Sequence, residues 1–299
     1  MRRRPVKKAL VLSLLLLPAL PVAAARNVVA TTSSMGMLAS AVGGSEVTVT
    51  VLAPPDRDPH SLQARPNMMV ALRGADLLVA VGAELEAGWL PAALQGAANG
   101  RLLPGGPGYF EAAAQVTLIE AGAAADRSQG DVHPGGNPHL ALDPERMTTV
   151  ARALATRLSA LDPAHGADYR ARAEAFARAV AVHVPAWKEK VRGVPGIVAY
   201  HKDVNYLAAF LGVPVLGYVE PLPGIPPSAP YLKELTDRLR GKKGVVVHTD
   251  YQPAKGPGFV ARALGWPVVR LPIEPPLGAT VEGWLSLLDR WVDGIATGR

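Results

Sequence analysis

The sequence predicts an α/β protein in which two α/β lobes with mostly parallel sheets are joined by one long helix. Short apolar strands alternate with helical segments in the first half of the chain, and the same alternation returns in the last third. Between them lies a stretch rich in Ala, Arg and Glu that has no glycine after Gly166, which favours a long helix. Alternating strands and helices are typical of parallel sheets covered by helices.

The first 25 residues have the pattern of a secretory signal peptide. Five basic residues precede an apolar run from Ala9 to about Leu20, and Ala23–Ala25 end the segment. This order is typical of a cleaved signal, and the apolar run is shorter than the about 20 residues that a membrane span needs. We expect cleavage after Ala24 or Ala25 and export to the periplasm; an uncleaved membrane anchor is the alternative.

Removal of this segment would remove most of the net charge. It carries five of the 31 Lys and Arg and none of the 25 Asp and Glu, so the remainder has 26 basic and 25 acidic residues. A nucleic-acid surface needs clustered basic residues on the folded domain, so no nucleic-acid partner is expected. The chain has no cysteine. Disulfides are therefore excluded, and any metal site must be built from His, Asp and Glu.

The N-terminal lobe is expected over residues 26–162. Residues 101–136 are rich in Gly, Pro and Ala and are expected to be mostly loop. Apolar residues recur at helical spacing in the last helix of this lobe. Strands are predicted at Asn27–Thr32, Glu46–Leu52 and Ala75–Val81, and helices at Met35–Val42, Asn67–Arg73 and Asp143–Leu161.

The linking helix is expected over residues 163–192 and the C-terminal lobe over residues 193–299. Pro185 is expected to kink or interrupt the linking helix because proline cannot donate a main-chain hydrogen bond. In the C-terminal lobe, strands are predicted at Gly196–Tyr200, Val213–Val219, Gly244–Val247 and Pro267–Leu271, and helices at Asn205–Leu211, Ala229–Arg240, Gly258–Leu264 and Val281–Ile295.

Three histidines have local contexts that suit a site in a cleft between the lobes. His60 follows a predicted strand in PPDRDPHSLQ, His139 lies in the loop segment GGNPHLALDP, and His201 directly follows the strand GIVAY. Ligands of open α/β sheets bind beyond the carboxyl ends of the strands. Taken singly, each histidine could equally be an ordinary loop or core residue, and their wide separation in sequence excludes a local chelating motif.

Four segments of this sequence resemble the metal-binding solute-binding proteins of ABC importers, the zinc-uptake family. They are DPHSLQARPNMMVALRGADLLVAVGAELEAGWLP, NPHLALDPERM, AYHKDVNYLAAFLGV and VEPLPGIPPSAPYLKEL, in this order along the chain. The first segment matches the family pattern at Pro59–His60, Pro66, Leu72, Ala75–Leu77, Gly82, Leu85–Glu86 and Trp89, with one extra residue before the tryptophan.

The resemblance implies that His60, His139 and His201 bind a metal through their ring nitrogens, in the cleft between two lobes that a rigid helix joins. For the fourth ligand, the family places a carboxylate after the last strand of the second lobe, which corresponds to Glu274. The sequence there, IEPPLG, is one residue longer than the family pattern. Asp250 and a water molecule are therefore alternatives.

Two further residues lie near these motifs. His133 lies six residues before His139, where some family members carry a longer His-rich loop, and it is expected to be either an auxiliary metal contact or a surface residue. Glu220 is expected to brace the cleft from outside the ligand set.

The resemblance implies a periplasmic carrier that captures zinc and delivers it to an ABC transporter permease in the inner membrane. Manganese is the alternative cargo, although nitrogen-rich ligation favours zinc. We expect a monomer without enzymatic activity. A metal-binding surface adhesin and a zinc metallohydrolase are the alternatives; the second would need a general base, and no motif supplies one.

Overall fold

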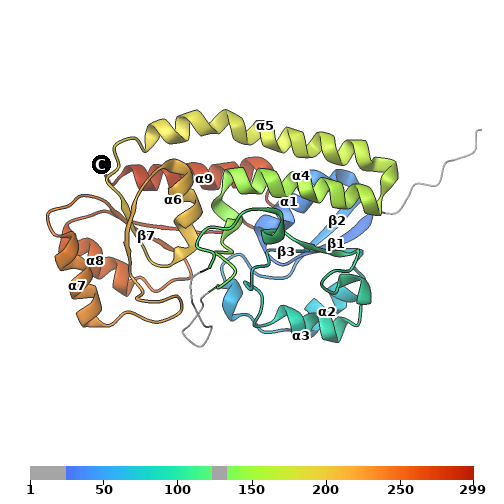
Figure 1. Cartoon of the computed structure of the whole chain (residues 1–299), viewed down its shortest axis with the longest axis horizontal. Coiled ribbons are helices and arrows are strands. Elements are labelled where there is room, and N and C mark those ends of the chain that lie inside the picture. The colour runs from blue at the N-terminus through green and yellow to red at the C-terminus, as the bar shows by residue number, and fades with distance from the viewer. Residues whose placement is uncertain (1–24, 123–132) are drawn as a thin grey trace, which may run out of the picture.

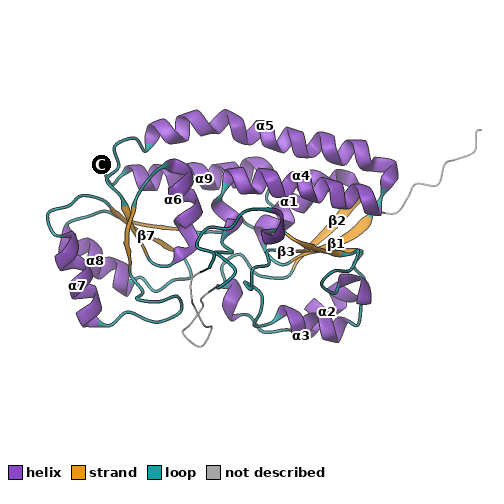
Figure 2. Cartoon of the chain, viewed as in Figure 1, coloured by secondary structure: helices purple, strands orange, loops and turns teal. Residues whose placement is uncertain are grey.

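The computed structural model describes residues 25–122 and 133–299 and has two lobes that one long helix spans (Figure 1). The predicted signal peptide, apart from Ala25, lies outside the described residues. Each lobe contains a four-stranded parallel sheet with helices on both faces (Figure 2). The predicted fold class is thereby confirmed. None of the helices within the described ranges is long and apolar enough to cross a membrane.

The N-terminal sheet has the strand order β2-β1-β3-β4. The central strand β1 pairs with both neighbours, so that Val28 lies beside Val49 of β2 and Leu77 of β3. Helix α1 packs closely on this sheet because Gly36 faces β2, where a Cβ atom would lie 2.4 Å from Val51 Cγ2. The strands are β1 Arg26–Ala30, β2 Val47–Val51, β3 Leu77–Ala80 and β4 Tyr109–Glu111.

The C-terminal sheet repeats this topology with the order β6-β5-β7-β8. In each sheet the connection from one central strand leads to one edge strand, and the connection from the other central strand leads to the opposite edge strand. This arrangement leaves a crevice at the carboxyl ends of the two central strands. The segments after β5 and β8 contact residues of the N-terminal lobe, so the carboxyl edges of the two sheets face each other. The strands are β5 Ile197–Ala199, β6 Val215–Tyr218, β7 Val245–Thr249 and β8 Val268–Leu271.

Nine α-helices cover the sheets within the described residues. They are α1 Ser33–Gly43, α2 Pro66–Arg73, α3 Leu90–Ala97, α4 Pro144–Leu161, α5 Gly166–Lys190, α6 Asn205–Leu211, α7 Ala229–Leu239, α8 Lys255–Leu264 and α9 Val281–Ala296. Helix α5 runs along both lobes, with α4 and α9 beneath it (Figure 1). It continues through Pro185, where we expected a kink or a break. The last turns after this proline are held to α9, since Trp187 Nε1 donates to Asp289 Oδ1 at 2.6 Å.

One hydrophobic core runs through both lobes on the side of α5, and a smaller core lies under the opposite face of each sheet. The shared core includes Val28 and Val79 of the first sheet, Ala199 and Val247 of the second, and Trp284 of α9. Trp284 stacks on Phe176 of α5 and donates through Nε1 to Ala141 O of the N-terminal lobe at 2.8 Å. Because this core is continuous between the lobes, its packing opposes wide opening of the lobes.

Candidate metal centre

His60 lies in the short 3-10 helix Pro59–Ser61, after β2, and two side chains fix its position. Asp58 begins this turn, and its Oδ1 accepts hydrogen bonds from the His60 main-chain N at 2.9 Å and from Nδ1 at 2.7 Å. Trp89 Nε1 donates to Pro59 O at 2.9 Å. Since a carboxylate can only accept, Nδ1 carries the proton and the lone pair of His60 Nε2 is directed into the cleft.

His139 is held by the asparagine two residues before it. Asn137 Oδ1 accepts from the His139 main-chain N at 2.9 Å, and Asn137 Nδ2 donates to Lys202 O of the C-terminal lobe at 2.9 Å. Tyr206 Oη of α6 donates to Asn137 O at 2.6 Å. The motif Asn-Pro-His therefore positions His139 against the second lobe, although it belongs to the first.

His201 follows β5 directly and lies with its ring buried against Glu220. Nδ1 of His201 and Oε1 of Glu220 form a short hydrogen bond, and Glu220 Oε2 also accepts from the Gly224 main-chain N at 3.3 Å. Glu220 thus fixes the His201 tautomer in the way that Asp58 fixes that of His60, so the expectation that Glu220 braces the cleft agrees with its contacts.

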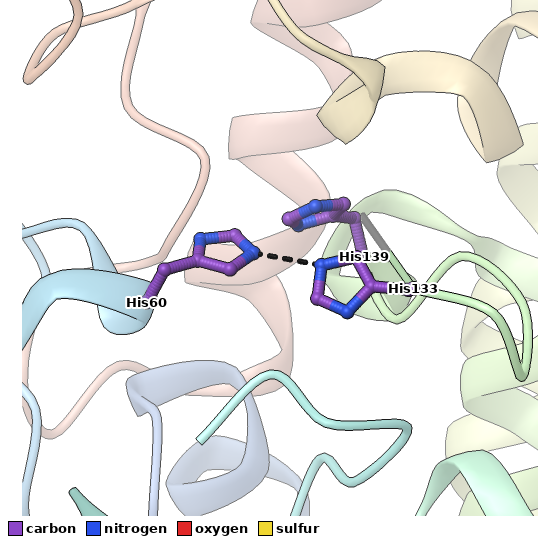
Figure 3. A group of neighbouring side chains, drawn as sticks. All are labelled: His60, His133 and His139. Atoms are coloured by element: carbon purple, nitrogen blue, oxygen red, sulfur yellow. Dashed lines mark hydrogen bonds between the residues drawn. The ribbon is translucent and has the colours of Figure 1, made fainter. Parts of the chain in front are cut away.

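Four histidine rings meet where the lobes face each other. His201 Nε2 lies 3.0 Å from His139 Nε2, and His60 Nε2 lies 3.0 Å from His133 Nε2. The His60 and His139 ring centroids are 5.1 Å apart. His60, His133 and His139 each offer a ring nitrogen within 4.8 Å of the others (Figure 3). Ring nitrogens that converge in this way can hold a transition metal.

A cavity of about 220 Å³ opens beside two of these histidines and is lined by residues of both lobes. His60 and Asp58 contribute from the first lobe, and His201, Glu220 and Tyr251 from the second. It has room for several water molecules, and two of the predicted histidines line it.

The electrostatics of the cluster favour neutral imidazole at its centre. Burial, together with the charges that His201 and His60 would carry when protonated, holds the pKa of His139 well below its ordinary value. Burial alone would lower the pKa of His201 as well, but its hydrogen bond with Glu220 and the charge of Asp203 outweigh burial and raise it. Neutral His139 is ready to bind metal without first losing a proton.

Glu274 lies after β8, and its carboxylate reaches the N-terminus of α1 in the other lobe. Oε2 accepts from the Ser34 main-chain N at 2.6 Å and from Ser33 Oγ at 3.2 Å, and Oε1 accepts from Ser34 Oγ at 3.0 Å. Burial raises the pKa of Glu274 to about 7, although the Ser34 and Ser33 hydrogen bonds act to lower it. Glu274 therefore connects the lobes through a helix N-terminus, which attracts carboxylates.

The structure thus brings together the three predicted histidines and adds His133 beside His60. Asp250, the alternative carboxylate, follows β7 and its main-chain O accepts from Arg270 at 2.6 Å. The role of Asp58 was missed at the level of sequence. An aspartate before Pro-His at a turn was the available signal, because Asp readily bonds to main-chain N–H groups two residues on.

Comparison with known proteins identifies the family. Residues 28–298 match the family described as zinc-uptake complex component A, periplasmic. The high-affinity zinc uptake system protein ZnuA of Yersinia pestis is 26% identical over 291 residues, covering 92% of this chain and 91% of the relative.

Solved structures share the fold. The solute-binding protein FpvC of Pseudomonas aeruginosa, solved with Mn²⁺, has a TM-score of 0.76 at 22% identity, with 91% of this chain and 97% of that chain covered. The laminin-binding adhesin Lmb of Streptococcus agalactiae has a TM-score of 0.70 at 24% identity, with 90% and 99% covered. At these identities the likeness shows the fold. Since the family match extends over nearly the whole chain, the protein belongs to the periplasmic zinc-uptake component A family, which confirms the predicted membership of the metal-binding proteins of metal uptake systems.

Proposed function

We propose that this chain captures zinc in the periplasm through His60, His139 and His201 and delivers it to an ABC permease in the inner membrane. The observation that carries the proposal is the meeting of these rings from both lobes, with the Nε2 atoms of His139 and His201 3.0 Å apart. Asp58 and Glu220 orient two of the rings for metal binding. Zinc suits such a nitrogen-rich site better than manganese does.

Delivery requires release, and the shared core limits how release can occur. Trp284 of α9 and Phe176 of α5 stack within that core, and Trp284 also bonds to Ala141 of the first lobe. We therefore propose that the metal leaves through movement of the loops that carry the histidines, without wide separation of the lobes. Residues 26–162 and 193–299 would act as the two halves of the carrier, residues 163–192 as its rigid link, and the monomer as the working unit.

A carrier fits the site better than the two alternatives. An adhesin needs no buried ligand cluster, whereas His139 and His201 are 6% and 7% exposed. A zinc hydrolase needs an open coordination position and a placed general base, and the carboxylates beside these rings are already committed to Nδ1 atoms. A carrier should bind one zinc ion per chain and hydrolyse no ester, peptide or phosphate substrate.

Isothermal titration of the metal-free mature protein with zinc tests the proposal. His139→Ala and His201→Ala should each lower the affinity strongly, because each removes one ligand of a small set. His165→Ala and His183→Ala are matched controls, since these histidines pair with Asp162 and Asp289 away from the cluster. Zinc binding by His201→Ala at parental affinity would refute the site. For the fourth ligand, Glu274 remains a prediction, with Asp250 or water as its alternatives.

A further inference from the structure

We propose that His133 is a direct zinc ligand and that it, together with His60, His139 and His201, completes a site of four imidazoles. The inference rests on the proposed function and deepens it, because it assigns the fourth ligand and with it the choice of metal. Glu274 then has a different task, which is to join the lobes outside the ligand set.

The ring geometry supports four ligands around one ion. Zinc–nitrogen bonds of about 2.0–2.1 Å in a tetrahedron place neighbouring ligand nitrogens roughly 3.3 Å apart. His60 and His133 approach this separation with Nε2 atoms 3.0 Å apart, and so do His139 and His201. The two pairs are in turn close to each other, since the His60 ring centroid is 5.1 Å from that of His139 and 5.8 Å from that of His201, and His133 lies 5.9 Å from His139.

The charges around the cluster balance a divalent ion without a carboxylate ligand. Four neutral imidazoles leave both positive charges of zinc uncompensated, which is costly in a buried site. Asp58 and Glu220 lie directly behind His60 and His201 and bond to their Nδ1 atoms. These two carboxylates supply two negative charges and increase the basicity of the rings that they contact.

The carboxylate of Glu274 already has hydrogen-bond donors at the N-terminus of α1. Its two oxygens accept three hydrogen bonds from Ser33 and Ser34, one of them from a main-chain N at 2.6 Å. To bind the metal, the carboxylate would have to leave these donors, and the N-terminus of α1 would lose its anionic partner. His133 Nε2, in contrast, already lies 3.0 Å from His60 Nε2 within the cluster (Figure 3).

A site of four imidazoles has a consequence for metal choice. Manganese prefers oxygen ligands and higher coordination numbers, whereas zinc accepts four nitrogens in a tetrahedron. His133 therefore acts as a specificity residue: it occupies the position that a carboxylate or water would otherwise offer to manganese. Its removal should weaken zinc binding and narrow the preference for zinc over manganese.

X-ray absorption at the zinc edge tests the assignment directly. The metal-free mature chain, loaded with one equivalent of zinc, should show four imidazole ligands and no oxygen. His133→Ala should show three imidazoles and one oxygen, and it should lose zinc affinity by more than the roughly 10–100-fold that an outer partner of a ligand typically contributes. Glu274→Gln should retain four imidazoles, and His165→Ala is the matched control for loss of an unrelated histidine.

The spectrum of the parent protein decides the question even if a variant fails to fold. Three imidazoles with one oxygen in the parent would overturn the inference, and loss of that oxygen signal in Glu274→Gln would reassign the ligand to the carboxylate. The failure of the proposed function is distinguishable. If His133→Ala leaves affinity unchanged while His139→Ala abolishes binding, only the inference fails; if neither variant changes zinc binding, the carrier site itself is wrong.

Discussion

Replacement of Glu274 by glutamine should change how the stability of the metal-free protein depends on pH. Burial raises the pKa of this carboxyl from 4.5 to about 7 in the folded protein. Between these values the folded state binds a proton that the unfolded state has released, so this group makes stability fall as pH rises. The stabilisation that this group contributes to the folded state is fully present below pH 4.5 and is lost as the pH rises to 7 and above.

The size of the effect follows from the shift. A difference of about 2.5 pKa units corresponds to roughly 3 kcal/mol of unfolding free energy between low and high pH. Glutamine carries no charge at any pH and retains an oxygen that can accept from the Ser34 main-chain N. The unfolding free energy of Glu274→Gln minus that of the parent should therefore rise by about 3 kcal/mol between pH 4.5 and pH 8.

Urea unfolding with a chelator present, at intervals of half a pH unit, measures this difference. Glu282→Gln is the matched control, because Glu282 is exposed at the first turn of α9 and its pKa is lowered, first of all by its main-chain hydrogen bond. This control should show no rise across the same window. A flat difference for Glu274→Gln would mean that the carboxylate is solvated or paired in solution, and it would refute its burial at the N-terminus of α1.

The remaining predictions concern export, packing and the histidine partners. Mass spectrometry of periplasmic protein should find Ala25 or Arg26 at the N-terminus, and an uncut N-terminus would contradict export by a cleaved signal. Trp284→Ala should lower the unfolding free energy by about 3–5 kcal/mol in urea titration, and a loss below 1 kcal/mol would argue against a shared core. Asp58→Asn and Glu220→Gln should each weaken zinc binding about 10–100-fold, as measured by calorimetry. Unchanged zinc affinity would show that these two carboxylates do not orient the histidine rings for metal binding. The zinc affinity of the parent should fall steeply between about pH 7 and pH 5, because protons compete for the imidazole nitrogens. If the zinc affinity stayed the same across this pH range, histidine ligation would be excluded.

Much of the fold could be predicted from local sequence. Apolar runs such as Ala75–Val81 can be predicted as strands because buried parallel strands need no polar face. Helix α4 can be predicted because its apolar residues recur with helical period. Pro185 does not interrupt helix α5, although a proline within a helix removes a main-chain donor. The contact of Trp187 with Asp289 of α9, which stabilises the turn that follows, is tertiary.

The sequence by itself was enough to predict His60, His139 and His201 as site residues at strand ends and in loops, and to predict the family to which the protein belongs. Only the tertiary structure decided which groups surround them. It placed Glu220 behind His201 and brought His133 into the cluster, whereas the contact of Asp58 with His60 is local. The reason is that a strand-end histidine is set by the local chain, whereas these partners come from distant segments, 73 residues apart in the case of His60 and His133, and sequence spacing carries no information about such contacts.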